Sequence, residues 1–302
     1  MGKLLIAMGA ALWGMIGVFV TNLNNAGFTA FEIVAIRAIT ASLFLVTYTI
    51  FKNRESLKIK VRDSKYFIGT GIISIVFFNW CMFTAIEETS MSIAAILLYT
   101  APIFVAIMAR ILFKELFTKR KILALMMTFS GCAFVIGVLP STSESISLFG
   151  VLVGVGSGFF YALYSIFGKY ALVKYNSLTI SVYTFIFAAI AVVPFSGLWV
   201  DVGRFASLEV WLSILGLGLF STMLAYMLYT AGLNMVESSQ ASIIATIEPV
   251  VAAISSFLIF NERLDAWQYL GIILVISAVI FVQSNQKQKS HIPLDQQDVV
   301  KN

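Results

Sequence analysis

Hydrophobic residues along the chain fall into long runs separated by short polar segments. A run of about 18 or more apolar residues can cross the roughly 30 Å hydrocarbon core of a bilayer as one helix. The pattern therefore predicts an all-α polytopic membrane protein with ten transmembrane helices and little chain left for any other domain. The expected spans are 3–21, 31–52, 66–85, 90–113, 121–138, 148–169, 177–197, 209–231, 239–260 and 266–283.

Two stretches of the chain, 90–138 and 237–283, share one pattern at a fixed shift that places Pro102 over Pro249. Each proline interrupts an apolar run, and each run ends in a short polar hinge, Phe-Lys-Glu-Leu in the first copy and Phe-Asn-Glu-Arg in the second. A half with five spans, duplicated in tandem, gives two halves of opposite orientation. Inverted repeats of this kind are typical of secondary transporters.

The repeat predicts the domain organisation. Residues 1–140 form the first five-helix repeat, residues 141–285 the inverted second repeat, and residues 286–302 a polar cytoplasmic tail. The run after Lys3 is expected to be the first span, because it is longer than the apolar core of a signal peptide and lacks a convincing cleavage site.

Charge distribution predicts which way the spans run. With 60% hydrophobic and 12% charged residues, the net charge of +5 bears on topology and gives no reason to expect nucleic acid as a partner. Positive residues favour cytoplasmic loops. One side of the expected topology collects sixteen of the twenty basic residues, the other side has only Arg204 and Arg263, and Arg37 and Arg110 lie within spans. Both termini are therefore expected in the cytoplasm, and equivalent loops of the two repeats on opposite faces.

Composition gives no support for an enzyme. The chain has one histidine, His291 in the tail, and two cysteines, Cys81 and Cys132, which both fall in expected spans and predict no disulfide. We find no serine-histidine-acid set, no phosphate-binding loop, no dinucleotide fingerprint and no metal-ligand cluster. No enzyme activity, cofactor or metal is expected.

Several short motifs, in this order and spacing, give the chain a resemblance to a known family. They are Trp13-Gly14, the Arg-Ala-Ile-Thr-Ala segment beginning at Arg37, Tyr99-Thr-Ala-Pro102, Lys114-Glu115, Glu248-Pro249 and Asn261-Glu262-Arg263. Nearly the whole chain before about residue 285 resembles the EamA-type ten-helix transporters of the drug/metabolite transporter superfamily.

This resemblance implies two five-helix bundles around a central cavity, alternating access, and export of amino acids or related metabolites. Spans 1, 3, 4, 6, 8 and 9 would line the cavity, with spans 5 and 10 peripheral. The related small multidrug exporters use a glutamate in their first helix. Spans 1 and 6 here contain no acid, so cation export by that device is not expected.

Two charged residues inside the spans are candidates for mechanism. An ionisable group near the bilayer midplane is costly and usually faces a cavity or a partner. Glu248 is therefore a candidate proton carrier or amine-binding group, with the alternative that it satisfies backbone groups freed at Pro249. Arg37 could bind a substrate carboxylate, although bracing of a facing helix is the favoured interpretation. Arg110, near the basic edge, is expected to extend to the membrane surface.

The paired prolines are candidate hinges, because symmetry-related broken helices are where transporters build binding sites. Mid-span aromatic and amide residues could stack on a substrate and hold its polar end. The candidate cavity residues are Trp13, Arg37, Asn79, Trp80, Tyr99, Tyr161, Tyr164, Tyr226, Tyr229 and Glu248, with Pro102 and Pro249 as hinges.

The sequence thus predicts a metabolite exporter of the cell (inner) membrane, secondary-active or facilitative, as a monomer or homodimer. Its expected partners are a small-molecule substrate, the lipid bilayer and, through Glu248, the proton. Alternatives are an organic-cation exporter, a nucleotide-sugar or triose-phosphate translocator, a membrane-embedded enzyme, and a non-transporting sensor. The phosphate-ligand alternative would require paired basic residues deep in the cavity, where Arg37 stands alone.

Overall fold

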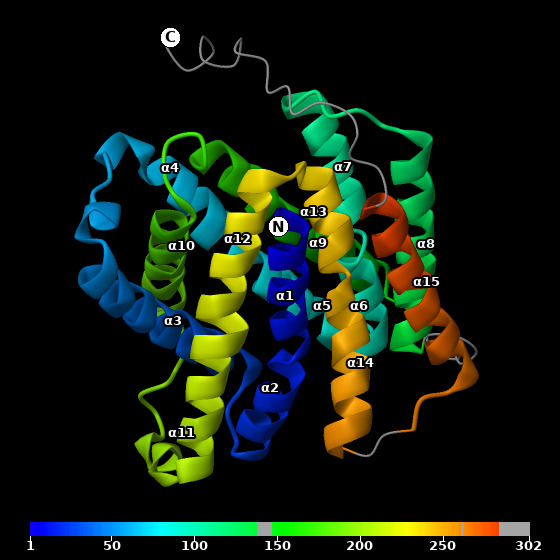
Figure 1. Ribbon diagram of the computed structural model, residues 1–302. Coiled ribbons are helices and arrows are strands. Elements are labelled where there is room, and N and C mark those ends of the chain that lie inside the picture. Colours follow the sequence, from blue (N-terminus) through cyan, green and yellow to red (C-terminus); the bar gives the residue numbers. More distant parts are fainter. Residues whose placement is uncertain (138–146, 261–262, 284–302) are drawn as a thin grey trace.

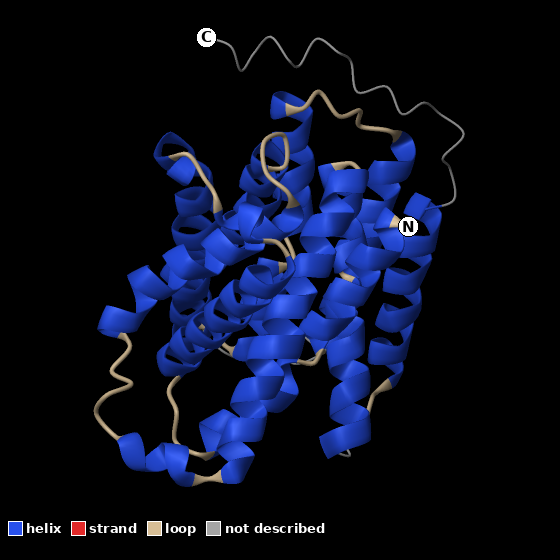
Figure 2. Ribbon diagram, turned by 60° about the vertical axis from the view of Figure 1, so that its left-hand side comes forward, coloured by secondary structure: helices blue, strands red, loops and turns tan. Residues whose placement is uncertain are grey.

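The computed structural model describes residues 1–137, 147–260 and 263–283, and over these residues the chain forms helices and no strands (Figure 1, Figure 2). The expected tail 286–302 and the hinge residues 261–262 lie outside the described residues. The main helices, in chain order, are α1 (Gly2–Gly14), α2 (Ile16–Asn25), α3 (Ala30–Lys52), α4 (Ser64–Phe67), α5 (Phe77–Glu88), α6 (Met91–Leu98), α7 (Ala101–Leu112), α8 (Lys119–Ile136), α9 (Leu148–Ala171), α10 (Ser177–Val192), α11 (Leu208–Leu215), α12 (Ala225–Met235), α13 (Ser238–Ala245), α14 (Ile247–Phe260) and α15 (Ala266–Gln283). Short 3₁₀ turns are η1 (Arg54–Leu57), η2 (Val61–Asp63), η4 (Val193–Phe195) and η5 (Val202–Ala206), and two π-helical stretches are η3 (Ile68–Val76) and η6 (Gly216–Leu224).

Many of these pieces join end to end into helices of membrane-spanning length. Eight are long and apolar enough to cross a bilayer: Gly2–Asn25, Ala30–Lys52, Val61–Glu88, Met91–Leu112, Leu148–Ala171, Ser177–Phe195, Leu208–Met235 and Ser238–Phe260. Two further helices, α8 and α15, have 18 residues each. Helix α8 opens with Lys119-Arg120-Lys121, which lowers its mean hydropathy, and the apolar part of α15 is shorter, Ala266–Val282. The count of ten spans therefore stays a prediction.

Helix boundaries recur along the chain. Met91 begins α6 and Ser238 begins α13, a shift of 147 residues, and the same shift of 147 separates Lys119 at the start of α8 from Ala266 at the start of α15. The π-helical stretches η3 and η6 each have nine residues and occupy equivalent places before α5 and α12. π-Helices are rare and often mark functional positions. Two separate parts of the chain thus build the same irregular helices.

The helices pack in pairs that mirror one another. Helix α1 packs along α12 and α5 packs along α9, while α3 packs on α10 and α8 packs on α15. The last pair lies at one edge of the molecule, away from α3 and α10 (Figure 1). Broken helices α6–α7 and α13–α14 lie between these pairs, with α6 and α7 against α9, and with α13 and α14 against α1. This arrangement puts the helix breaks near the middle of the protein.

Glycines bring α9 close to its neighbours, as a four-residue spacing of small residues predicts. A Cβ atom at Gly150 would lie 2.6 Å from the Thr89 side chain, and one at Gly154 would lie 2.4 Å from Leu97. A Cβ atom at Gly158 would lie 2.9 Å from the Leu97 carbonyl oxygen. These three glycines thus form a close helix–helix seam along α9.

Basic loops gather on one face, which we call the basic face: the α3–α4 connection, the α7–α8 linker and the α9–α10 turn. On this face the α3–α4 connection is clamped to the second half of the chain. Asp63 pairs with Lys174 at 2.9 Å and accepts a hydrogen bond from the Tyr175 hydroxyl at 2.8 Å, and Thr179 donates to the Ser56 carbonyl. The hydrogen bond that Lys174 donates to Asp63 raises the pKa of Lys174, which favours the charged form of this lysine in the clamp.

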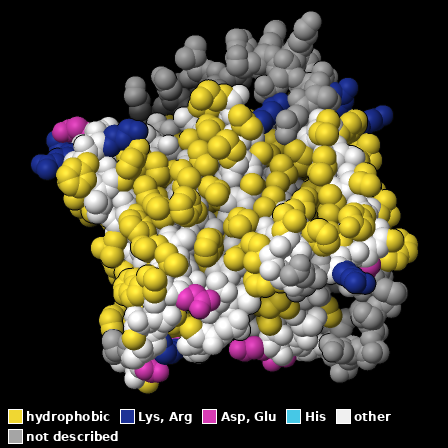
Figure 3. Space-filling model, turned by 60° about the horizontal axis from the view of Figure 1, so that its bottom comes forward, with side chains coloured by type: hydrophobic (Ala, Val, Ile, Leu, Met, Phe, Trp, Pro, Cys, Tyr) yellow, Lys and Arg dark blue, Asp and Glu magenta, His cyan; other side chains and the backbone are white. Residues whose placement is uncertain are grey.

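A second clamp holds the opposite face. Arg204, in η5, makes two hydrogen bonds to the Glu32 carboxylate at 3.0 and 2.6 Å, donates to the Gly27 carbonyl, and lies 4.5 Å over the Phe28 ring. Glu32 also forms a capping box with Thr29 at the start of α3. Figure 3, with this face turned forward, shows most of the visible carboxylates toward the lower end and most of the visible lysines and arginines along the upper edge. The clamp on the basic face joins the α3–α4 connection to the α9–α10 turn and the start of α10. The clamp on the opposite face joins the start of α3 to η5, which follows α10.

Arg204→Gln is expected to lower the free energy of unfolding by about 1–3 kcal/mol, because it removes charge-assisted hydrogen bonds from the buried Glu32 carboxylate. Arg263→Gln is the matched control, since Arg263 is exposed, and it should stay within about 0.5 kcal/mol of the parent. Thermal unfolding of both variants in one detergent measures the difference. Equal melting temperatures for the two variants would show that the Arg204 clamp does not contribute to stability.

Candidate functional site

The site lies where two helices break. Helix α6 ends at Leu98 and α7 begins at Ala101, with Pro102 in its first turn; α13 ends at Ala245 and α14 begins at Ile247. Proline cannot donate a backbone hydrogen bond, so it is tolerated in the first turn of a helix and disrupts the turn before it. Both prolines thus lie where the sequence placed the breaks. Their role as moving hinges stays a prediction.

A threonine stabilises each break in the same way. The Thr100 hydroxyl donates to the Leu97 carbonyl at 2.6 Å, and the Thr246 hydroxyl donates to the Ile243 carbonyl at 2.6 Å. These bonds satisfy carbonyl groups near each break. The two breaks are therefore built alike, on helices from different halves of the chain.

Glu248 occupies the first turn of α14, immediately after the break. Its Oε2 accepts a hydrogen bond from the Tyr161 hydroxyl of α9 at 3.3 Å. Both side chains are partly buried, and so is Tyr99 in the break of the other helix. A carboxylate at a helix N-terminus is also favoured by the helix dipole. The acid predicted to carry mechanism therefore lies beside both helix breaks.

A small cavity of about 10 Å³ adjoins this acid. That is about the room that one water molecule needs, roughly 10–15 Å³. Its walls come from α7, α9, α12, α13, α14 and the α6–α7 break, and they are mostly apolar with a few hydroxyls and one carboxylate. The lining residues are Tyr99, Ala101, Pro102, Val105, Tyr161, Ser165, Tyr229, Ser242, Ala245, Thr246 and Glu248.

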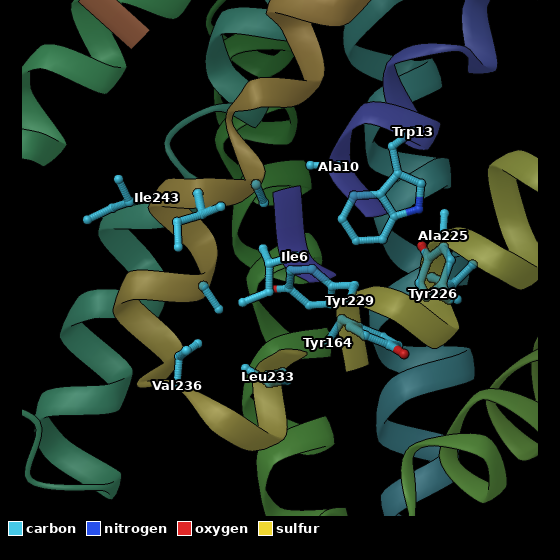
Figure 4. Close-up of a cluster of buried hydrophobic side chains, with 14 of the residues drawn as sticks. Ile6, Ala10, Trp13, Tyr164, Ala225, Tyr226, Tyr229, Leu233, Val236 and Ile243 are labelled. Carbon is cyan, nitrogen blue, oxygen red and sulfur yellow. The ribbon is translucent and has the colours of Figure 1, made fainter. Parts of the chain in front are cut away.

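A buried aromatic cluster adjoins the cavity through Tyr161 and Tyr229. Figure 4 shows four of its members, Trp13, Tyr164, Tyr226 and Tyr229. The centre of the Trp13 ring, on α1, lies 4.9 Å from the ring centres of both Tyr226 and Tyr229 of α12. It lies 6.3 Å from the ring centre of Tyr161. Tyr164 of α9 lies 5.0 Å from Tyr226. These are the edge-to-face and tilted ring arrangements that aromatic pairs favour. The structure thus brings together five aromatic residues that the sequence identified.

Hydrogen bonds fix most of the cluster in place. The Tyr164 hydroxyl pairs with Thr230 at 2.7 Å, and the Tyr229 hydroxyl pairs with Ser165 at 2.6 Å. The Trp13 indole nitrogen is buried and has no hydrogen-bond partner within the described protein. A buried donor without an acceptor is costly.

Arg37 braces the π-helical stretch η6. Its Nε donates to the Thr222 hydroxyl at 2.9 Å, and that hydroxyl donates to the Leu217 carbonyl at 2.8 Å. The guanidinium group lies 5.8 Å from the centre of the Tyr226 ring, within the range of a cation–π interaction. The structure therefore places Arg37 in the bracing role that the sequence favoured, next to the aromatic cluster.

Two of the candidate residues lie elsewhere. Asn79 is buried on α5, and its amide donates to the Ile75 carbonyl at 2.7 Å, where the π-helical stretch η3 ends. The Trp80 side chain is 52% exposed, and none of the ring contacts described above involves it. The structure does not bring Trp80 to the cluster. The hydroxyls of Ser165, Ser242 and Thr246 were not among the sequence candidates, and only their position on cavity-lining helices could have indicated them.

The described residues contain no group of three or more histidine, cysteine, aspartate or glutamate side chains able to hold a metal ion. Cys81 and Cys132 are both buried and unpaired. The chemistry available at the site is therefore that of one carboxyl group, several hydroxyls, an indole N–H and aromatic ring faces.

The whole chain was also compared with known proteins. The EamA-like transporter family matches residues 1–137 and again residues 148–284. The chain belongs to this family. The resemblance noted from the short motifs is thereby confirmed, and the protein is a multi-pass membrane transporter.

Curated relatives agree with the family assignment. The uncharacterized transporter YxxF of Bacillus subtilis is 26% identical over 98% of this chain and 93% of its own length. An uncharacterized transporter of Archaeoglobus fulgidus is 26% identical over 92% of this chain and 95% of its own. The uncharacterized inner membrane transporter YicL of Salmonella typhimurium is 23% identical over 96% of this chain and 97% of its own length.

A solved crystal structure has the same architecture, with a TM-score of 0.79 over 93% of this chain and 95% of its own. The two sequences are 12% identical, so this likeness shows the fold alone. Family membership favours transport over catalysis.

Proposed function

We propose that the protein is a secondary-active or facilitative exporter of amino acids or related small metabolites, with its substrate site at Glu248 and the aromatic cluster. The observation that carries the proposal is the meeting of two similarly broken helices beside one half-buried carboxyl group. Transporters commonly build their sites from such broken helices near the bilayer midplane.

In this proposal the chain forms ten spans in two inverted five-helix repeats. The equal shift between helix boundaries and the double match to the family support the duplication. An odd number of spans in each repeat inverts the second copy. The crowding of lysine and arginine on the basic face then makes that face cytoplasmic, together with the N-terminus, by the positive-inside rule.

The described conformation corresponds to an outward-facing state in this scheme. On the cytoplasmic side α13 packs against α7, whereas the equivalent pair, α6 and α14, is not in close contact among the described helices. Alternating access would require α6 to close on α14 as α7 separates from α13.

The chemistry of the site fits a small amphipathic solute with an amine. Glu248 offers a carboxylate for an ammonium group, the rings of Trp13 and Tyr161 offer apolar faces, and the unpaired Trp13 indole N–H offers a donor for a carboxylate. An amino acid carries all three features. Among the described residues that line the cavity, none is lysine or arginine, which disfavours a phosphate ligand.

Organic-cation export is the second candidate. It is favoured by the aromatic rings around Glu248, because ring faces and a carboxylate together attract cations. The nearby Arg37 guanidinium, 5.8 Å from the Tyr226 ring, opposes a net positive charge in the same space. We therefore place amino acids first.

Proton coupling would run through the same carboxyl group. An apolar site favours the neutral form of an acid and a bound ammonium group favours the charged form, so proton and substrate would compete for Glu248. Such competition is the basis of antiport: the proton binds from outside as the substrate leaves. A facilitator without ion coupling would use the same site for the substrate alone.

Uptake into proteoliposomes tests the proposal. Pools of labelled amino acids, nucleobases and organic cations would be offered with and without a pH gradient. We expect saturable uptake for the amino-acid pool and acceleration by a gradient that drives protons the opposite way. Saturable uptake of organic cations alone would replace the first candidate by the second. No uptake from any pool, with protein shown to be folded, would contradict the proposed function.

A further inference from the structure

A buried carboxylate joins the two halves of the protein at the basic face. Glu115 lies in the α7–α8 linker and is only 9% exposed. It accepts hydrogen bonds from the backbone amides of Ser238 at 2.7 Å and Ser239 at 3.1 Å, and from the Ser239 hydroxyl. These amides open α13. Glu115 therefore caps a helix that begins more than a hundred residues later in the chain.

This cap replaces one that the helix does not make itself. Glu237, at the N-cap position of α13, makes no capping hydrogen bond with its own side chain. The unsatisfied amides and the helix dipole at an N-terminus both favour an anion, and bonds to a charged acceptor are stronger than neutral ones. The α7–α8 linker thus supplies the anion that caps the start of α13.

Lysines complete the contact. Lys121 of α8 is nearly buried, and its Nζ lies 2.8 Å from Glu237 and 3.6 Å from Glu115. Lys169 of α9 donates to the carbonyls of Leu233 and Val236, both at 2.7 Å, just before α13. The α12–α13 turn is therefore held by charged groups from the first half and from α9.

The linker is held in a costly conformation. Lys114 has a φ of 56°, and it is the only non-glycine residue with positive φ among the described residues. This region costs energy for a side chain with a Cβ atom. The Glu115 amide donates to the Ala109 carbonyl, and Arg110 donates to the Glu115 carbonyl. The strained turn places Glu115 against α13 and would relax if that contact opened.

The contact between Glu115 and the start of α13 lies about one helix turn from the proposed substrate site. One turn along α13 from Ser239, Ser242 donates to the Ser239 carbonyl at 3.0 Å and lines the cavity at Glu248. Helices α7 and α13 pack against each other and both line the cavity. Glu115 joins the linker that follows α7 to the start of α13, so it closes the space between these two helices at the basic face. Opening that space separates the Glu115 carboxylate from the α13 amides.

We propose that Glu115, with Lys121 and Glu237, is the latch of the cytoplasmic gate. While its carboxylate caps α13 the substrate site is closed to the basic face, and the site opens to that face when the cap is lost. The proposal rests on the proposed transport function for its biological meaning. It makes a prediction about accessibility that does not depend on knowing the substrate.

The test uses a thiol reporter in the cavity wall. Ser242→Cys would be introduced into protein carrying Cys81→Ala and Cys132→Ala, and labelled with a membrane-impermeant maleimide in sealed vesicles of each orientation. Glu115→Gln should raise labelling from the basic face by about tenfold or more, because it removes the charge from three hydrogen bonds. Glu55→Gln is the matched control, an exposed acid on the same face that pairs only with exposed Lys58, and should leave labelling unchanged.

Two further variants separate a latch from a merely structural contact. Lys121→Met should also raise labelling from the basic face, and Glu115→Asp, which keeps the charge on a shorter side chain, should give an intermediate rate. Unchanged labelling in Glu115→Gln and Lys121→Met, even with a lower melting temperature, would overturn the latch. Absence of solute flux in the parent, together with the expected labelling changes, would instead contradict the transport function and leave the gate in place.

Discussion

Glu248→Gln is expected to abolish the effect of a pH gradient on solute accumulation. Glutamine has nearly the same shape and can still accept the Tyr161 hydrogen bond, but it cannot bind or release a proton. A gradient of one pH unit corresponds to a free energy of about 1.4 kcal/mol per proton. One-to-one antiport can therefore maintain about a tenfold ratio between the solute concentrations on the two sides of the membrane. The parent should approach this ratio, and the variant should stay near equal concentrations on both sides.

The measurement is solute accumulation in proteoliposomes at several imposed pH gradients. Glu87→Gln is the control, because Glu87 is an exposed acid near the end of α5. It should accumulate solute as the parent does. Accumulation by Glu248→Gln equal to that of the parent at every gradient would exclude Glu248 as the proton carrier. Loss of all binding by the variant would instead identify Glu248 as a direct ligand of the substrate.

Gly14→Ala is expected to lower transport by about tenfold or more by displacing α14 at the substrate site. A Cβ atom at Gly14 would lie 2.6 Å from the Glu248 carbonyl oxygen and 3.0 Å from the Ala252 amide nitrogen. Both are backbone atoms, so α1 and α14 must move apart to admit the methyl group. Overpacking of this kind costs about 1–3 kcal/mol of stability, and a small displacement at a binding site is enough to impair function.

Gly17→Ala is a matched control on the adjoining helix α2. Apart from its two chain neighbours and the backbone of its own helix turn, no atom lies within 4 Å of the position where its Cβ would be, so this variant should transport normally and gain a little stability from helix propensity. Gly158→Ala should repeat the Gly14 effect at the other break, where its Cβ would lie 2.5 Å from the Thr100 hydroxyl oxygen. Gly156→Ala, whose nearest neighbour would be Cys81 at 3.6 Å, should not. Equal activity of all four variants would contradict close packing at the breaks.

Much of this architecture could be predicted from the sequence because membrane helices leave a strong local signal. Apolar runs predicted the eight helices that are long and apolar enough to span a bilayer, and the paired prolines predicted the helix breaks at Tyr99–Thr100 and Thr246. Mid-span placement made Trp13, Tyr161 and Glu248 candidates, and the family resemblance implied that their helices line one cavity. The spans and the breaks need only helix geometry and hydropathy, whereas the shared cavity needed the resemblance.

The helix face of Trp80 could not be predicted in the same way. The π-helical stretch η3 lies just before α5, and its wider turns rotate all following residues relative to a regular α-helix. Asn79 therefore faces inward and Trp80 outward, and hydropathy does not distinguish a π-helix from an α-helix.

The contact between Glu115 and Ser238 was also missed. The hinge motif containing Glu115 was recognised, but its partner is a helix N-terminus in the other half of the chain, and backbone amides leave no signal in side-chain chemistry. Only the three-dimensional packing of α7 against α13 brings the two together.

Solute counterflow tests the central claim, that one site between the two repeats is exposed alternately to each face. Proteoliposomes would be loaded with unlabelled amino acid, diluted into a trace of labelled amino acid, and sampled over time without a pH gradient or membrane potential. We expect a transient accumulation of label above its outside concentration, because the carrier exchanges one bound solute for another. Label that rises only to the outside concentration, and never above it, would indicate a channel and contradict alternating access.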